Sequence, residues 1–169
     1  GGLDALGTAK TDNMYHAGWA WAGSTPYRST KLVAAHFGGT RQPMAVAWPK
    51  RIKPDATPRP QFHHVIDVVP TIYEATKITP PRVVNGEPQD SIDGVSMAYS
   101  FADAAAPSRR TTQYFEMIGN RAIYHDGWVA CTTPPVPPWD PRAAEVDAIE
   151  GYQWELYHTD PDFSQSENL

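Results

Sequence analysis

Cysteine is almost missing from this sequence of 169 residues, in which Cys131 is the single thiol. One thiol forms no internal disulfide, and it excludes zinc or iron–sulfur sites that need several cysteines. Long apolar runs are missing too, because the longest, Met44 to Trp48, is far shorter than the roughly 18 residues that cross a bilayer. We therefore expect no membrane span.

Excess positive charge is also lacking, since 14 Lys and Arg stand against 19 Asp and Glu, giving a formal net charge of -5. Nucleic-acid binding needs clustered cations that face phosphates, so we expect no nucleic-acid partner. Hydrophobic residues make up 41% and charged residues 20%, which is typical of a folded chain rather than a disordered one.

Proline is abundant, with 17 residues, about twice the usual frequency of roughly 5%. The prolines separate short apolar runs, which predicts long irregular connections. The chain also opens at Gly1 without a methionine or a secretory signal profile and stops at Leu169. We expect an excerpt of a longer soluble polypeptide, and the sequence leaves open whether it is cytoplasmic or periplasmic.

The first hundred residues have the pattern of an α/β fold. A helix is predicted from Pro26 to His36, with Thr25 as its N-cap and Gly38-Gly39 beyond its end. Met44 to Trp48, enclosed by two prolines, predicts a strand buried on both faces of a sheet. Such a strand needs neighbours on both sides, which we expect from polypeptide outside this sequence.

The region from Phe62 to Lys77 predicts the firmest helix, with an apolar stripe that faces inward. Pro70 then belongs in the first turn of a segment that begins near Asp67, because proline removes an interior donor. The stripe consists of Phe62, Val65, Ile66, Val69, Ile72 and Tyr73. A polar loop over 79–93 and a short helix or turn over 94–101 follow.

From about residue 106 the pattern changes to short strands. Residues 111–117, 121–125 and 128–132 are separated by Gly119-Asn120 and Asp126-Gly127, which are strong hairpin signals. Residues 154–157 predict one more strand. We expect two domains, an α/β part over 1–105 and a small antiparallel subdomain over 106–169.

Most candidate chemical groups have a structural explanation. His63, His64 and Asp67 have the spacing by which a helix presents metal ligands, but polar residues at a helix start are usually caps. Cys131 has no basic residue within six positions to lower its pKa, so we expect a buried strand cysteine. His125 falls at a predicted turn, where a solvated side chain is expected. No Gly-x-Ser-x-Gly motif supports a serine triad.

Lys31 stands before a dense stretch that runs from His36 to Arg41 and contains Gly38-Gly39. Glycines let the backbone approach an anion, and an ammonium about 4 Å from a sulfate or phosphate charge is worth about 4 kcal/mol at an effective dielectric near 20. A surface lysine is the alternative, and spacing alone favours it.

Motifs in a fixed order across nearly the whole chain resemble the second half of bacterial type I arylsulfatases, and single words of them also occur in related phosphonate and phosphate monoester hydrolases. The motifs are Gly18-Trp19-Ala20-Trp21-Ala22, Thr25-Pro26-Tyr27, Thr30-Lys31, His36-Phe37-Gly38-Gly39-Thr40-Arg41, Trp48-Pro49, Asp67-Val68-Val69-Pro70-Thr71-Ile72, Asn85-Gly86, Arg110-Thr111-Thr112-Gln113-Tyr114-Phe115-Glu116-Met117, Gly119-Asn120-Arg121, Tyr124-His125-Asp126-Gly127-Trp128, Trp154-Glu155-Leu156-Tyr157 and Asp162-Phe163-Ser164-Gln165.

The resemblance implies the C-terminal portion of a sulfatase-like α/β fold, with part of a large mixed sheet and a small antiparallel subdomain. It implies hydrolysis of aryl sulfate monoesters by a formylglycine nucleophile beside a bound Ca²⁺. The formylglycine motif and the calcium carboxylates have no counterpart here, and Cys131 does not match the motif. We expect both before residue 1, in the missing N-terminal part of the polypeptide, so this chain alone should be inactive.

One functional residue carries over from the family, because Lys31 matches the lysine that contacts the sulfate and the leaving-group oxygen. His36 and Arg41 are interpreted as structural. Two alternatives stay open: a phosphonate or phosphate monoester hydrolase, and a non-catalytic binding module suggested by six Trp and eight Tyr. Buried rings would exclude the second, and large aromatics in predicted strands usually fill the core.

Overall fold

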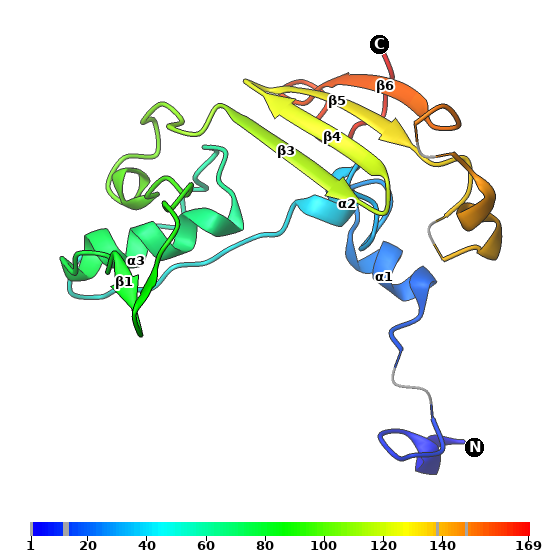
Figure 1. Ribbon diagram of the computed structural model, residues 1–169, viewed down its shortest axis with the longest axis horizontal. Helices are drawn as coiled ribbons and strands as arrows, with labels where there is room; N and C mark the ends of the chain where they lie inside the picture. Colours follow the sequence, from blue (N-terminus) through cyan, green and yellow to red (C-terminus); the bar gives the residue numbers. More distant parts are fainter. Residues whose placement is uncertain (1, 12–13, 138, 148) are drawn as a thin grey trace. The chain divides into compact units, whose positions relative to one another are not determined.

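The computed structural model describes residues 2–11, 14–137, 139–147 and 149–169. Two compact units form (Figure 1): Gly1–Pro43 joins Tyr114–Leu169 in what we call the sheet unit, and Met44–Gln113 makes the helix unit. The secondary structure mixes helices with small antiparallel sheets, as the fold class predicts in general terms. The predicted domain division at residue 105 stays a prediction.

The sheet unit is built on a four-stranded sheet in the order β3-β4-β5-β6. Its strands are β3 (Thr112–Met117), β4 (Asn120–His125), β5 (Trp128–Thr133) and β6 (Gln153–His158). Asp126 and Gly127 link β4 to β5 with φ of 42° and 84°, the backbone of a two-residue hairpin turn. The antiparallel strands predicted from the sequence are confirmed.

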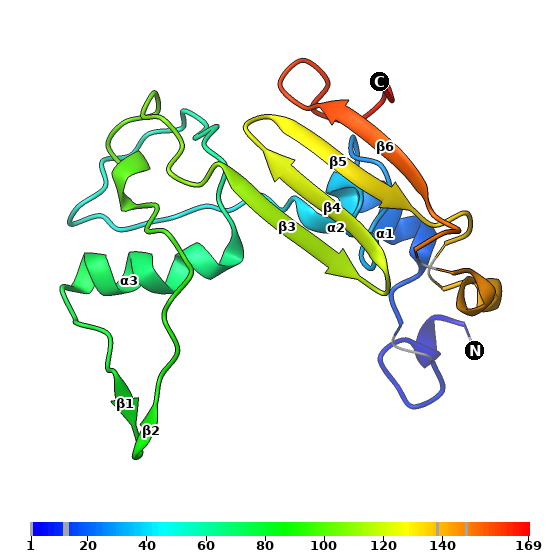
Figure 2. The same ribbon diagram turned by 45° about the horizontal axis from the view of Figure 1, so that its top comes forward.

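One face of this sheet carries the hydrophobic core. Ala122, Cys131 and Glu155 lie opposite one another in register, so their side chains share a face. The segment that leads into α2 (Phe37–Thr40) packs against that face, as Figure 2 shows. The cluster consists of Val33, Ala35, Phe37, Ala122, Val129, Cys131 and Tyr157.

The predicted helix over 26–36 is wrong. Helix α1 (Ala17–Gly23) ends before it, and α2 begins only at Phe37. Ser29 and Leu32 have φ of 63° and 77°, which a right-handed helix cannot accommodate. The residues between them and α2 are therefore an irregular segment, although most of them are buried. Two short turns of 3₁₀ helix, Leu3–Ala5 and Pro141–Glu145, complete the unit's described elements.

The helix unit contains α3 (Val68–Thr76), preceded by a 3₁₀ turn at Val65–Asp67. Pro70 lies in the first turn of α3, as predicted, and Lys77 ends the helix with φ of 59°. A two-stranded hairpin of β1 (Val83–Val84) and β2 (Glu87–Pro88) follows, and a 3₁₀ turn at Ala98–Ser100 falls within the predicted short helix.

Asp67 organises this unit, because its side chain is fully buried and accepts hydrogen bonds from two loops. The backbone N–H groups of His64 and Val95 donate to it at 2.9 and 2.7 Å, and Arg110 Nε donates at 2.9 Å. Burial raises the pKa of Asp67, but these hydrogen bonds and the guanidinium hold the pKa below its ordinary value. The carboxylate is therefore ionised and paired.

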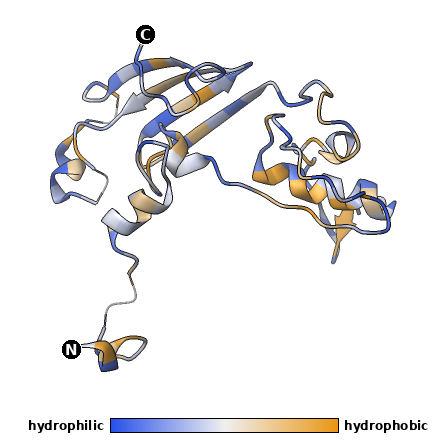
Figure 3. Ribbon diagram, turned by 180° about the vertical axis from the view of Figure 1, so that it is seen from behind, coloured by the Kyte–Doolittle hydropathy of each residue, from blue (hydrophilic) through white to orange (hydrophobic). Residues whose placement is uncertain are grey.

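The apolar side of α3 faces outward, which contradicts the predicted inward stripe. Val65 is 75% exposed and Ile72 54% exposed, whereas the polar Thr71 is buried and donates to the Asp67 carbonyl at 2.6 Å. Figure 3 shows α3 as a largely hydrophobic ribbon. Helix α3 therefore contacts the rest of its unit through its polar side.

The predicted core strand at Met44 to Trp48 is also absent from the described part of the chain. This segment is extended but unpaired, and Met44 is 56% exposed. A strand buried on both faces requires neighbours, and none of the described strands pairs with it. Among the described helices, none is long and apolar enough to cross a membrane.

Replacing Arg110 by alanine should lower the free energy of unfolding of the helix unit by about 3–5 kcal/mol, because a buried carboxylate then loses its counter-charge. The matched control is Arg109→Ala, since Arg109 is exposed and lies over the Tyr99 ring. Urea denaturation followed by circular dichroism measures both, and equal losses for the two variants would contradict the account.

Candidate functional site

Lys31 is an exposed side chain on a loop whose residues are mostly buried. We call residues 28–36 the Lys31 loop; within it Thr30 is 4% exposed and Ala35 is fully buried. Among the described residues, no hydrogen bond or ion pair involves the Lys31 ammonium. The loop thus presents one unneutralised cation from a buried backbone.

Gly38 and Gly39 allow this loop to lie directly on α2. A Cβ atom added to Gly39 would lie 2.0 Å from the Val33 carbonyl oxygen, and one on Gly38 would lie 2.3 Å from the Arg28 carbonyl oxygen. The Gly38 N–H donates to that Arg28 oxygen at 3.0 Å. The space at both glycines is therefore filled by the loop's own carbonyl groups rather than by an anion.

Two buried amide side chains hold the second half of the loop. Asn120, at the start of β4, donates from Nδ2 to the Leu32 carbonyl at 3.1 Å and accepts from the Ala34 N–H. Gln165 accepts from the Phe37 N–H at 2.7 Å and donates to the Ala35 carbonyl at 3.3 Å. Their side chains supply the partners that an irregular buried backbone cannot supply itself.

A histidine and a carboxylate hold the first half. His36 Nδ1 lies 2.8 Å from Ser29 Oγ, and His36 Nε2 lies 2.9 Å from Glu155 Oε2 on β6. Burial lowers the pKa of His36, even though the hydrogen bond to Glu155 opposes that shift. The imidazole is therefore neutral at pH 7, with Nε2–H donating to Glu155 and Nδ1 accepting from the Ser29 hydroxyl.

Glu155 binds further partners on the same face of the sheet. Thr133 donates to Oε1 at 2.9 Å, and Tyr157 donates to Oε2 at 2.5 Å. Arg28 reaches the Tyr157 hydroxyl at 2.5 Å. Burial raises the pKa of Glu155, but the hydrogen bonds from Tyr157, His36 and Thr133 hold the pKa below its usual value.

These side chains do not make a calcium site. Within the described residues, His36, Cys131 and Glu155 form one group whose possible ligand atoms lie within 4.8 Å of one another. Calcium takes 6–8 oxygen ligands, whereas this group offers nitrogen, sulfur and one carboxylate beside Arg28, whose guanidinium lies 3.6 Å from Glu155. Cys131 is fully buried in β5, which confirms the predicted buried strand cysteine, and burial raises the pKa of its thiol to about 12.

The other metal candidate is explained by local structure. Asp67 pairs with Arg110, and His64 caps the 3₁₀ turn through its Nδ1 and its backbone N–H. His125 lies exposed at the hairpin turn, where its Nε2 is 3.9 Å from Asp126. Neither place gathers a set of convergent ligands among the described residues.

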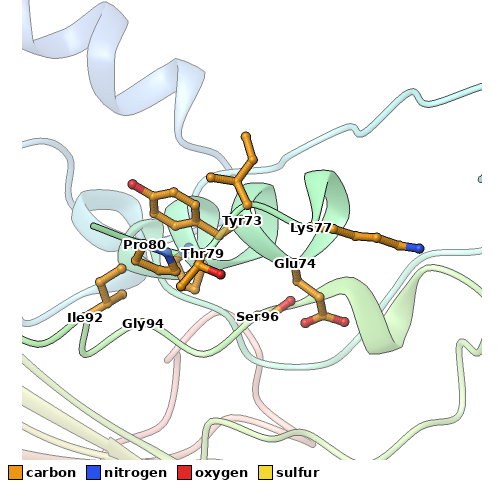
Figure 4. A pocket seen from close by; sticks show the side chains of 10 residues that line it. Tyr73, Glu74, Lys77, Thr79, Pro80, Ile92, Gly94 and Ser96 are labelled. Carbon is orange, nitrogen blue, oxygen red and sulfur yellow. The ribbon is translucent and has the colours of Figure 1, made fainter. Parts of the chain in front are cut away.

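A shallow groove of about 540 Å³ lies in the helix unit, beside α3 (Figure 4). Tyr73, Ile78, Pro80 and Ile92 give it a mostly apolar wall, and Glu74 and Lys77 supply one charge of each sign. Such a lining lacks the clustered cations that bind a sulfate ester, so the Lys31 loop remains the candidate site.

The tryptophans correct another expectation. Trp128 and Trp154, which lie in predicted strands and were expected to fill the core, are 41% and 65% exposed, and Trp19, Trp21 and Trp139 are exposed too. The Trp128 ring stacks on His158 with centroids 4.3 Å apart. Exposed rings leave an aromatic binding surface physically available.

Comparison with known proteins first identifies the fold. No family model matches the chain. A solved Bacteroides thetaiotaomicron sulfatase, described in work on the metabolism of multiple glycosaminoglycans, matches 84% of this chain and 28% of its own length, with a TM-score of 0.52 and 18% sequence identity. The chain therefore has the fold of a sulfatase portion.

The sequence comparison gives the same class. An uncharacterized sulfatase of Schizosaccharomyces pombe is 28% identical over 170 residues, which cover 99% of this chain and 28% of that protein. The chain is thus a relative of the sulfatases and spans about 28% of the length of the proteins it matches. The resemblance to a sulfatase portion is confirmed at this level.

Lys31 stays a prediction from the sequence. The sequence also interpreted His36 as structural, but it did not indicate Asn120, Glu155 and Gln165 as partners of the Lys31 loop. Asn120 forms its hydrogen bonds with loop residues that lie 86 and 88 positions away in the sequence, so no local pattern predicts them. The available signal was Glu155, a polar side chain inside the predicted strand over 154–157, because a buried polar group requires a partner. Asn120 was predicted in a turn and Gln165 outside any strand.

Replacing Gly39 by alanine should destabilise the sheet unit by about 2 kcal/mol or more, because the new methyl group overlaps the Val33 carbonyl. Gly23→Ala is the control, since a Cβ there meets nothing within 4 Å. Tryptophan fluorescence during urea unfolding reports this unit, which holds five of the six tryptophans. A stable Gly39→Ala variant would contradict the close packing.

The sheet unit should lose stability as the pH falls below 6.5. The unfolded state binds a proton at His36 near pH 6.5, whereas the folded state, with its lowered pKa, resists it. The groups facing this imidazole are Arg28, Cys131, Glu155 and Tyr157, and the hydrogen bonds of Glu155 are lost only at lower pH.

His36→Asn should reduce the slope of the unfolding free energy between pH 6.5 and pH 5, by at most about 1.4 kcal/mol per pH unit. His125→Asn, at an exposed histidine of the same unit, is the matched control. Urea titrations at several pH values measure the slopes. An unaltered slope in His36→Asn would show that the imidazole is not held neutral.

Proposed function

We propose that the chain is the portion of an arylsulfatase that contributes Lys31 to the binding of a sulfate monoester. The nucleophile, a formylglycine, and the Ca²⁺ would come from polypeptide outside these residues. The observation that carries the proposal is an exposed, unneutralised lysine on a buried loop held from both sides. Relatives that are sulfatases support it.

The chemistry asked of Lys31 is electrostatic. As the S–O bond of a sulfate ester breaks, negative charge grows on the bridging oxygen, and a nearby ammonium stabilises that charge most in the transition state. Because the backbone that carries Lys31 is already fixed, binding must order its side chain but not the loop. A lysine on a flexible loop would lack this advantage.

The exposed apolar surface of the helix unit supports a contact with further polypeptide. Most of the unit's large apolar side chains are exposed, and among them only Met97 is buried within residues 44–113. The exposed ones are Met44, Val46, Val65, Ile66, Val69, Ile72, Ile78, Val83, Val84 and Ile92. Apolar surface on this scale marks an interaction site, so we expect the remainder of a sulfatase polypeptide to cover it and the chain alone to be inactive.

The exposed tryptophans favour a second candidate function, the binding of a flat ligand without catalysis. Trp154 is 65% exposed, and the Arg121 guanidinium lies 5.9 Å from its ring centroid. Rings exposed in this way stack on sugars and other planar groups. Binding that is lost in Trp154→Ala but unchanged in Lys31→Ala would favour this function over hydrolysis.

In the complete polypeptide, Lys31→Ala should lower kcat/KM for 4-nitrophenyl sulfate by about 10²–10³-fold, the usual effect of removing one group that stabilises transition-state charge. Lys10→Ala, at another exposed lysine of the sheet unit, should leave the rate unchanged. An unaltered rate in Lys31→Ala would remove the assignment. Faster turnover of 4-nitrophenyl phosphate would identify a phosphate or phosphonate monoester hydrolase instead.

A further inference from the structure

We propose that Ser29, His36 and Glu155 are positioning residues for Lys31, acting as a clamp that fixes the loop from which the lysine projects. This inference rests on the proposed function, because it gives those three side chains a part in the same site. None of them would touch the substrate, so they would act through the loop backbone.

Ser29 lies in the turn two residues before Lys31. Its φ of 63° is uncommon for a residue that carries a side chain, so the turn needs an external restraint. The restraint is His36, whose Nδ1 lies 2.8 Å from the Ser29 hydroxyl and whose side chain is 5% exposed. The hydroxyl thus fixes the turn that precedes Lys31.

His36 is attached to the sheet through Glu155. Its Nε2 lies 2.9 Å from Glu155 on β6, and the two residues are 119 positions apart. Since Glu155 also binds Thr133 on β5, the clamp is tied to two strands of the sheet. A rigid element then determines where the loop backbone lies.

The negative charge of Glu155 is engaged by neighbours other than Lys31. Glu155 accepts hydrogen bonds from His36, Thr133 and Tyr157, and its nearest cation is Arg28 at 3.6 Å. The carboxylate is therefore occupied and does not neutralise Lys31. This arrangement restrains the loop through the imidazole and leaves the ammonium without a paired carboxylate among the described residues.

Limited trypsin digestion of the chain tests the clamp without activity, because Lys31-Leu32 is itself a cleavage site. Ser29→Ala breaks the bond between the loop and His36 and leaves the His36–Glu155 bond in place, so it should fold. We expect cleavage after Lys31 to accelerate about tenfold or more because the loop opens locally, while the urea midpoint falls only by the contribution of this one hydrogen bond. Mass spectrometry locates the cut.

Ser91→Ala, at an exposed serine of the helix unit, is the matched control and should cleave after Lys31 like the wild type. Equal cleavage after Lys31 in Ser29→Ala and the wild type would overturn the inference. An equal acceleration after Lys31, Arg41 and Lys50 would also overturn it, since that pattern reports general unfolding.

A double-mutant cycle in the complete polypeptide tests the link to Lys31. Ser29→Ala should lower kcat for 4-nitrophenyl sulfate about tenfold with little change in KM, and it should have no further effect in a Lys31→Ala background. A purely structural role for Ser29 would lower activity equally in both backgrounds, which would overturn the inference.

The two proposals fail in different ways. If Lys31→Ala retains full activity, the proposed function fails, whatever the digestion shows. If Lys31→Ala loses activity while Ser29→Ala retains full kcat, the proposed function stands and the clamp does not.

Discussion

The Lys31 loop depends on side chains from other parts of the sheet unit for its hydrogen bonds. It is neither helix nor strand, yet most of its backbone is buried, and buried N–H and C=O groups need partners. Asn120 and Gln165 supply them on one side of Lys31. On the other side, hydrogen bonds between the side chains of Ser29, His36 and Glu155 tie the loop to β6. Gly38 and Gly39 let the loop approach closely enough for these contacts.

Local signals in the sequence predicted local structure well. Asp126-Gly127 predicted a hairpin because both residues tolerate positive φ, and the strands on either side pair in the register that this turn sets. Pro70 predicted where α3 begins, since proline is accepted only in a first turn. In each case, a few neighbouring residues decide the outcome.

The failures share a physical cause, which is control by distant residues. The 26–36 segment has helix signals at both ends, but its contacts with Asn120 and Gln165 favour an irregular backbone. The apolar stripe of α3 and the run from Met44 to Trp48 predicted burial, and in this chain both are exposed. Lys31 itself is proposed through resemblance to a family, because an exposed lysine has no local signature of function.

Amide hydrogen exchange tests the central claim, that buried side chains hold the Lys31 loop in one conformation. The N–H groups of Ala34 and Phe37 donate to Asn120 and Gln165, so they should exchange as slowly as the paired amides of β5, such as that of Cys131. Exchange of these two amides at the rate of an unstructured chain, while β5 stays protected, would contradict the account.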